Sequence, residues 1–140
     1  MARSRRGGAA IEFALTVPVV VVLLGFILDW GFWFEAQSLA QAAARDCARA
    51  GAGAPPDTDP VPLARARADA LLAAEPGLVR AITRGATPVI TVALRGAAPA
   101  ALVDCTVALP AAPVVGLLAG PVAPPPDATA RFALRREVQP

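Results

Sequence analysis

The chain opens with a long apolar stretch. From Ala9 to Phe34 only Glu12 and Asp29 carry charge, and 16 uncharged residues separate the two. As a helix this stretch reaches roughly 39 Å at 1.5 Å per residue, against a hydrocarbon core of about 30 Å. The aromatic run WGFWF at 30–34 is typical of a membrane interface, where Asp29 and Glu35 would reach water. The pattern predicts a transmembrane helix over residues 8–34.

A helical pattern continues beyond the apolar stretch. Residues 35–50 hold neither glycine nor proline, so we expect the helix to extend outward until GAGAPP at 51–56. A loop, GAPPDTDPVP, follows. The sequence LARARADALLAAE at 63–75 then places arginines on one side and leucines on another, which predicts a second, amphipathic helix.

The last part of the chain changes to a period of two residues. Apolar side chains alternate with polar ones at 87–96, 101–110 and 128–137, which predicts three strands, and LVRAITR at 78–84 is a candidate for a fourth. The expected fold is α+β: a transmembrane helix extending into an outer helix, then a small domain with one further helix and a sheet of three or four antiparallel strands. The apolar, proline-rich connection 110–126 either covers the core or forms a patch for a neighbouring subunit.

Composition argues against catalysis. The chain has 140 residues, room for one small domain, and all 13 basic residues are arginine. His, Lys and Tyr are absent, and no metal-ligand cluster, phosphate loop or paired carboxylates are found. The arginines are scattered and aromatic residues are few outside the apolar stretch, which disfavours nucleic-acid binding. We therefore expect a protein that is not an enzyme and takes no cofactor.

Charge at the N-terminus predicts the orientation. Arg3, Arg5 and Arg6 precede the apolar stretch and should hold the N-terminus in the cytoplasm, so residues from Glu35 onward would lie outside the inner membrane, in the periplasm. A secretory signal cut at the small-x-small site of Ala40 and Ala42 is one alternative, although the apolar region is longer than usual. A plain signal anchor is another, but it leaves Glu12 and the glycines before it unexplained.

The residues around Glu12 suggest a specific family. In RRG-GAAIEFALTVP a basic leader ends at Gly7, a small residue follows, and Glu12 is the fifth residue counted from Gly8. This is the arrangement of type IV prepilins. The stretch also carries Glu12-Phe13, Leu15 to Pro18 and Asp29-Trp30-Gly31, and it resembles the TadE-like family of tight-adherence pilus systems. The likeness covers about 5–53 and is weaker in the C-terminal half, where DATARFALRRE is similar to the family's last strand.

The resemblance implies a pseudopilin or minor pilin for assembly of a tight-adherence (Flp-type) pilus. A prepilin peptidase would cut between Gly7 and Gly8, so residues 1–7 would be a leader, 8–34 a pilin-like transmembrane helix and 35–140 a periplasmic domain. The cut would lower the formal charge by three, from +2 to about −1. Expected partners are the peptidase, sibling pseudopilins, the major pilin, pilus platform proteins and inner-membrane lipid. The alternative is a signal-anchored periplasmic protein of unrelated function.

Two positions in the apolar stretch have opposed interpretations. Glu12 would pair with the new Gly8 amine of a neighbouring subunit and so set the axial register of assembly. Alternatively it is a helix-start carboxylate that reaches interfacial water. Pro18 removes one helix hydrogen bond and would kink or loosen the span, or it is simply tolerated there.

Cys47 and Cys105 are the only cysteines in the chain. One falls in the expected outer helix and the other on the apolar face of an expected strand. An oxidising periplasm favours a disulfide between them, with two unrelated buried thiols as the alternative.

Overall fold

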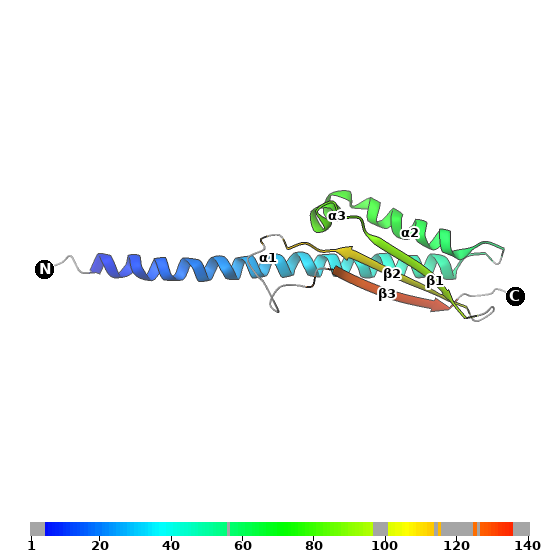
Figure 1. Cartoon of the computed structure of the whole chain (residues 1–140), viewed down its shortest axis with the longest axis horizontal. Coiled ribbons are helices and arrows are strands. Elements are labelled where there is room, and N and C mark those ends of the chain that lie inside the picture. Colours follow the sequence, from blue (N-terminus) through cyan, green and yellow to red (C-terminus); the bar gives the residue numbers. More distant parts are fainter. Residues whose placement is uncertain are drawn as a thin grey trace.

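One long helix leads into a small two-layer domain (Figure 1). The computed structural model describes residues 5–55, 57–96, 101–113, 115, 125 and 127–135. Its elements are the helices α1 (Arg5–Ala52), α2 (Pro60–Ala74) and α3 (Pro76–Thr83), followed by the strands β1 (Val89–Arg95), β2 (Leu102–Pro110) and β3 (Asp127–Arg135). This is the α+β arrangement that the sequence predicts.

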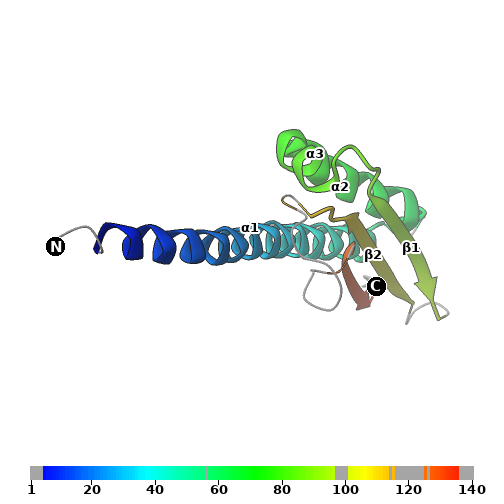
Figure 2. The ribbon, with the colours of Figure 1, turned by 60° about the vertical axis from the view of Figure 1, so that its left-hand side comes forward.

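Helix α1 runs unbroken for 48 residues and serves two environments. Its N-terminal half projects away from the domain, and its C-terminal half lies along the sheet (Figures 1 and 2). The change follows from composition, because the second half presents alanines that let the helix approach the sheet closely. The side chains of this contact are fully buried, namely Ala36, Ala40, Ala43, Ala44 and Cys47. The C-terminal half of α1 therefore forms one side of the hydrophobic core.

Helix α2 begins earlier than the sequence pattern suggests. The expected start is residue 63, but the helix begins at Pro60 because the Asp59 carboxylate accepts a hydrogen bond from the Val61 amide at 3.0 Å. Proline suits this first position, where its missing N–H is not needed. Pro60, Ala64, Ala68 and Leu72 then form one buried stripe, four residues apart.

The segment 78–84 is helical, so its interpretation as a fourth strand is wrong. Pro76 starts helix α3. Leu78, Val79 and Ile82 lie at helical spacing and pack towards the core, and Arg84 ends the helix in a left-handed conformation with φ of 50°. The described residues thus form two helices beyond α1 rather than one.

The sheet has the order β1-β2-β3 with both pairs antiparallel. In the central strand β2 every second residue faces the helices: Val103, Cys105, Val107 and Leu109 are fully buried there. On this inner side α1 and α2 cover the sheet, while no helix or strand that the structure describes lies on the opposite side (Figures 1 and 2). Arg136 and Glu137, which the pattern adds to the last strand, lie outside the described residues, as does most of the 110–126 connection.

Candidate assembly site on the N-terminal helix

Every residue of the projecting half of α1 from Gly8 to Leu24 is exposed among the residues that the structure describes. Large apolar side chains from Ile11 to Leu24 are exposed, with Phe13 at 71% and Leu15 at 70%. The helix qualifies by length and composition as one membrane-span candidate within Gly8–Ala52, where the most apolar window has a mean hydropathy of 2.6. So extensive an apolar surface requires lipid or neighbouring helices around it. This is consistent with membrane anchoring.

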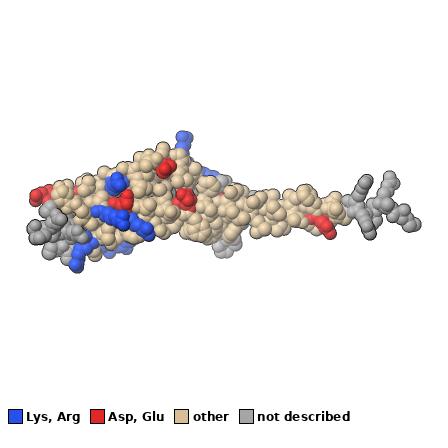
Figure 3. All heavy atoms as spheres, turned by 180° about the vertical axis from the view of Figure 1, so that it is seen from behind, with Lys and Arg blue, Asp and Glu red and all other residues tan. Residues whose placement is uncertain are grey.

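Glu12 is the only charged residue between Gly8 and Leu28. The projecting helix accordingly carries a single acidic patch, whereas the other charges gather on the domain (Figure 3). The Glu12 side chain is exposed and makes no ion pair with any residue whose side chain the structure describes. Its backbone carbonyl accepts a hydrogen bond from the Thr16 hydroxyl at 2.7 Å. The carboxylate thus faces outward from an apolar surface.

The expected cleavage site and proline lie within the same helix. Gly7 and Gly8 belong to the first turns of α1, and a Cβ placed at Gly8 would have no atom within 4 Å. A protease that binds extended backbone would have to unwind this turn, and glycine lowers the cost of doing so. Pro18 lies inside α1, which continues through it as a helix.

The sequence pattern predicts that the side chain of Asp29 reaches water at the membrane interface. In the structure this side chain is buried instead. It is 2% exposed, and its Oδ1 accepts a hydrogen bond from the Val115 amide at 2.8 Å. Nearby, the Arg84 guanidinium donates to the Pro113 carbonyl, and the Ala112 amide donates to the Ile82 carbonyl at 3.4 Å. Asp29 therefore holds the described part of the connection after β2 against α1, a contact that the sequence pattern does not predict.

Aromatic rings cluster around the turn that holds Asp29. Trp30 contacts Phe26, Trp33 and Phe34, with ring centroids 5.9, 5.7 and 5.8 Å away respectively. Tilted and edge-on pairs of this kind are favourable, and together they stiffen the helix at the boundary between its projecting and packed halves. This is the segment in which the sequence predicts a membrane interface.

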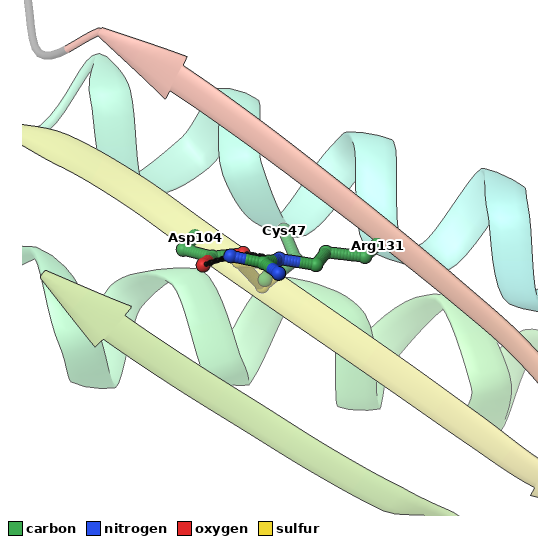
Figure 4. Close-up of a disulfide and its surroundings, with 4 residues drawn as sticks. Cys47, Asp104 and Arg131 are labelled. Atoms are coloured by element: carbon green, nitrogen blue, oxygen red, sulfur yellow. Dashed lines mark hydrogen bonds and ion pairs between the residues drawn. A yellow bond between two sulfur atoms is a disulfide. The ribbon is translucent and has the colours of Figure 1, made fainter. Parts of the chain in front are cut away.

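Helix α1 is covalently joined to the centre of the sheet. The sulfur atoms of Cys47 in α1 and Cys105 in β2 form a disulfide that spans 58 residues of sequence, with the two Cα atoms 6.1 Å apart (Figure 4). In the loop-entropy model, closing a loop of this length stabilises the fold by about 4 kcal/mol. The bridge holds the packed half of α1 against β2.

An ion cluster occupies the other side of β2. Asp104 is 4% exposed although none of the described helices covers this side of the sheet. Two arginines cover it: Arg131 Nε donates to Oδ1 at 2.8 Å, and Arg95 Nε lies 2.8 Å from Oδ2 (Figure 4 shows Arg131). The hydrogen bond from Arg131 lowers the pKa of Asp104, because it stabilises the ionised carboxylate. Sequence reasoning did not identify this cluster.

The assembly-type features are all on α1, and the described residues offer no metal site. No group of three or more metal-binding side chains occurs among them. Of the sites expected from the sequence, the glycine pair, Glu12, Pro18 and Cys47 lie along α1 rather than in one pocket, and Cys105 lies in β2. Such an arrangement suits contact with neighbours along the helix.

Comparison with known proteins gives a match to one family model. The model described as TadE-like protein matches residues 7–49, which include the glycine pair, Glu12, Pro18, Asp29 and Cys47. The chain matches no curated protein and no solved structure. The matched range is nearly the whole of α1, so the projecting half and most of the packed half are TadE-like in sequence. Residues 7–49 are therefore a TadE-like segment, as the motifs around Glu12 indicate.

Proposed function

We propose that this protein is a TadE-like pseudopilin or minor pilin, a structural and interaction subunit for assembly of a tight-adherence pilus in a bacterial inner membrane. One observation carries the proposal: an uncovered apolar helix presents a single carboxylate, Glu12, that has no partner among the described side chains. The TadE-like match over the same helix supports it. In this role the protein binds other subunits and catalyses no reaction.

Processing prepares the helix for assembly. A prepilin peptidase removes residues 1–7 by hydrolysing the peptide bond between Gly7 and Gly8. Loss of three arginines frees the N-terminal end of α1 from the cytoplasmic face and leaves an ammonium group at Gly8. Before cleavage, the same arginines keep the N-terminus in the cytoplasm, so the domain after α1's projecting half lies in the periplasm.

Glu12 then sets the position of neighbouring helices. A charge at the centre of a membrane helix costs about 2.5–3.5 kcal/mol on insertion scales, and less near an interface. Pairing with the Gly8 ammonium of a sibling pseudopilin or of the major pilin offsets this cost, because the attraction is stronger in a low dielectric than in water. Only one axial offset between two helices aligns the groups. Platform proteins and lipid complete the surroundings of the helix.

The core argues against removal of the helix as a secretory signal. Ala36 and Ala40 are fully buried beneath the sheet. Cutting after Ala42 would delete both and uncover the apolar groups that they contact. A mature protein that keeps α1 would stay anchored in the membrane by its projecting half.

Replacement of Glu12 tests the proposal. Glu12→Leu and Glu12→Gln should insert into the membrane normally, since both make the apolar segment less polar and keep the arginines. They should fail to assemble, because the Gly8 ammonium loses its partner. The measurements are surface piliation and co-purification with sibling pilins, in cells where the variant is the only copy.

Glu35→Gln is the matched control. Glu35 is an exposed carboxylate on the same helix, at the outer end of the apolar stretch. Its replacement should leave piliation unchanged. Normal pili and normal partner binding in Glu12→Leu cells would remove the docking role and favour a signal-anchored protein of unrelated function.

A further inference from the structure

The two edges of the sheet differ in how they are covered. At the β3 edge, α1 lies alongside, and the Gln37 side chain donates a hydrogen bond to the Thr129 carbonyl at 3.0 Å. At the β1 edge, backbone hydrogen bonds within the described part of the chain run only to β2. Among the described residues, no group pairs with the outer row of N–H and C=O groups of β1.

The features that usually protect an edge occur only at the two ends of β1, where Pro88 precedes the strand and Arg95 is its last residue. Its register with β2 is unbroken over seven residue pairs, so it has no bulge. From Val89 to Leu94 it contains no proline and no charge. Val89 is 57% exposed and Leu94 is 45% exposed. Natural sheets blunt exposed edges with bulges, prolines or lysines, so an edge without them between its ends is suited to pairing with another strand.

A cleft lies where β1 begins. It has a volume of about 430 Å³ and is lined by α2, α3 and residues 85–88, including Leu72, Val79 and Pro88. Because Pro88 directly precedes Val89, a strand laid along β1 would reach this cleft with one end. The cleft would take a terminal side chain of that strand.

We propose that the β1 edge binds an extended strand from a different subunit of the same membrane assembly. The bound segment is about as long as β1 and carries apolar residues at alternate positions, which face Ile90 and Val92. Main-chain hydrogen bonds supply the pairing, and the alternation supplies the specificity. The identity of the partner as a co-assembling subunit rests on the function proposed above.

Geometry argues against a second copy of this chain at the edge. Strand β1 runs in the same general direction as α1, away from the N-terminus (Figures 1 and 2). If two copies paired antiparallel through β1, a two-fold axis perpendicular to the strands would relate them. The α1 helix of the second copy would then point in the opposite direction, away from the membrane. A two-fold axis along the strands would place equivalent side chains on opposite faces, which a sheet does not accept.

Head-to-tail pairing of β1 with a second copy's β3 is disfavoured as well. It would keep the membrane helices parallel, but the β3 edge already lies against α1, and the Thr129 carbonyl is engaged by Gln37. A strand from another polypeptide meets none of these obstacles.

The test uses the full-length protein in detergent micelles and a synthetic peptide as the probe. The peptide alternates valine and threonine over about the length of β1, and a second version carries N-methyl groups on alternate residues of one edge. Hydrogen exchange should show that some amides of Val89–Arg95 are open in the free protein and slow when the first peptide binds. The N-methylated peptide should not bind, because it cannot complete the ladder.

Two lysine variants distinguish specific peptide binding at the β1 edge from nonspecific adsorption to exposed apolar side chains. Leu94→Lys should weaken peptide binding by about tenfold or more, as edge lysines do in natural sheets. Leu63→Lys is the control, since Leu63 on α2 is 43% exposed and Leu94 is 45% exposed. It should bind as the unmodified protein does. In cells, Leu94→Lys should reduce co-purification with sibling pilins while membrane insertion and leader cleavage stay normal.

Several outcomes would overturn the proposal. Full protection of β1 amides in the free protein would mean that the edge is already covered, and equal binding of the N-methylated peptide would mean apolar adsorption. Protection that increases with protein concentration alone would place a second copy there. Normal co-purification by Leu94→Lys would also overturn it, whereas loss of assembly in Glu12→Leu with intact peptide binding bears only on the function proposed above.

Discussion

Asp104 depends on two arginines for its burial. Both partners are themselves more than half exposed, with 63% of the Arg95 side chain and 53% of the Arg131 side chain reaching solvent. Exposed partners are screened by water, so each contact contributes little by itself. The paired Arg131 nitrogens and the additional Arg95 nevertheless surround the carboxylate on the side of the sheet that none of the described helices covers. The cluster ties all three strands together by their side chains.

The ionisation of Asp104 should appear in the pH dependence of stability. Its pKa is lowered in the folded protein, first by the hydrogen bond from Arg131 and also by the charges of both arginines, which outweigh desolvation. Its contribution is therefore present above the unfolded pKa, near 4, and is lost as the pH falls through the lower folded value. Urea unfolding between neutral and strongly acidic pH should show this acid loss.

Asp104→Asn should remove that part of the acid dependence and lower the free energy of unfolding at neutral pH by about 1–2 kcal/mol. Asp127→Asn is the control, because Asp127 is an exposed acid on the same side of the sheet. Equal acid dependence in Asp104→Asn and the unmodified protein would show that the cluster stabilises nothing.

Sequence patterns predict only half of such a cluster. Alternation places Asp104 opposite Cys105, and Arg131 opposite Phe132, so both charges are expected on one side of the sheet. Their proximity depends on register, which pairs Thr106 with Arg131 and Asp104 with Ala133. The segment between β2 and β3 is long, so no short hairpin turn fixes this register, and the sequence pattern does not reveal it. Asp29 escaped prediction for a similar reason, because its partner Val115 is 86 residues away.

Among the elements, α1 and the strands were the most predictable. The pattern of α1 extends over many residues, and each strand shows several repeats of the two-residue period. Helix α3 was ambiguous because eight residues hold few repeats of either period. The start of α2 at Pro60 cannot be predicted from hydrophobicity, because Asp59 caps the helix by a hydrogen bond between its carboxylate and the Val61 amide. The type and bounds of a short element thus depend more on the capping and proline residues at its ends than on its hydrophobic period.

The contact between α1 and the sheet relies on a glycine. A Cβ added at Gly51 would lie 2.6 Å from Val103 Cγ1 and 3.1 Å from the Ala64 Cβ. Gly51→Ala should therefore lower the free energy of unfolding by about 1–3 kcal/mol, because the overlap forces the helix away from β2. Urea denaturation in detergent, followed by tryptophan fluorescence, measures the change.

Gly77→Ala is the matched control, since a Cβ there meets no atom within 4 Å and the residue is also helical. It should be neutral or slightly stabilising. If Gly51→Ala were as stable as the unmodified protein, α1 would have room to shift along the sheet.

For the whole molecule, the N-terminus of the mature protein distinguishes the possible functions. Mature protein should begin at Gly8, and Gly7→Val should block processing, because a β-branched residue resists both unwinding of the turn and entry into a narrow cleft. Gly8→Ala should still be processed, since it keeps a small residue after the cut. N-terminal sequencing of protein from the membrane fraction makes the measurement.

Other N-termini would have different meanings. A start at Ala43 would identify a secretory signal and would discard the buried Ala36 and Ala40. An intact start at Met1 or Ala2 would favour a plain anchor. The TadE-like match ends at residue 49, so the family alone does not define what the remaining domain does.

The Cys47–Cys105 bridge has a mechanical consequence. Tension applied to the projecting part of α1, as when a subunit is drawn out of a membrane, would reach β2 through this covalent link as well as through the buried alanines of α1. Because β2 is hydrogen-bonded on both sides, to β1 and to β3, the load is shared by two ladders that must slide together before either fails. A single noncovalent contact at the sheet margin would instead peel open one bond at a time. The bridge therefore keeps the sheet attached to α1 when the helix is under tension.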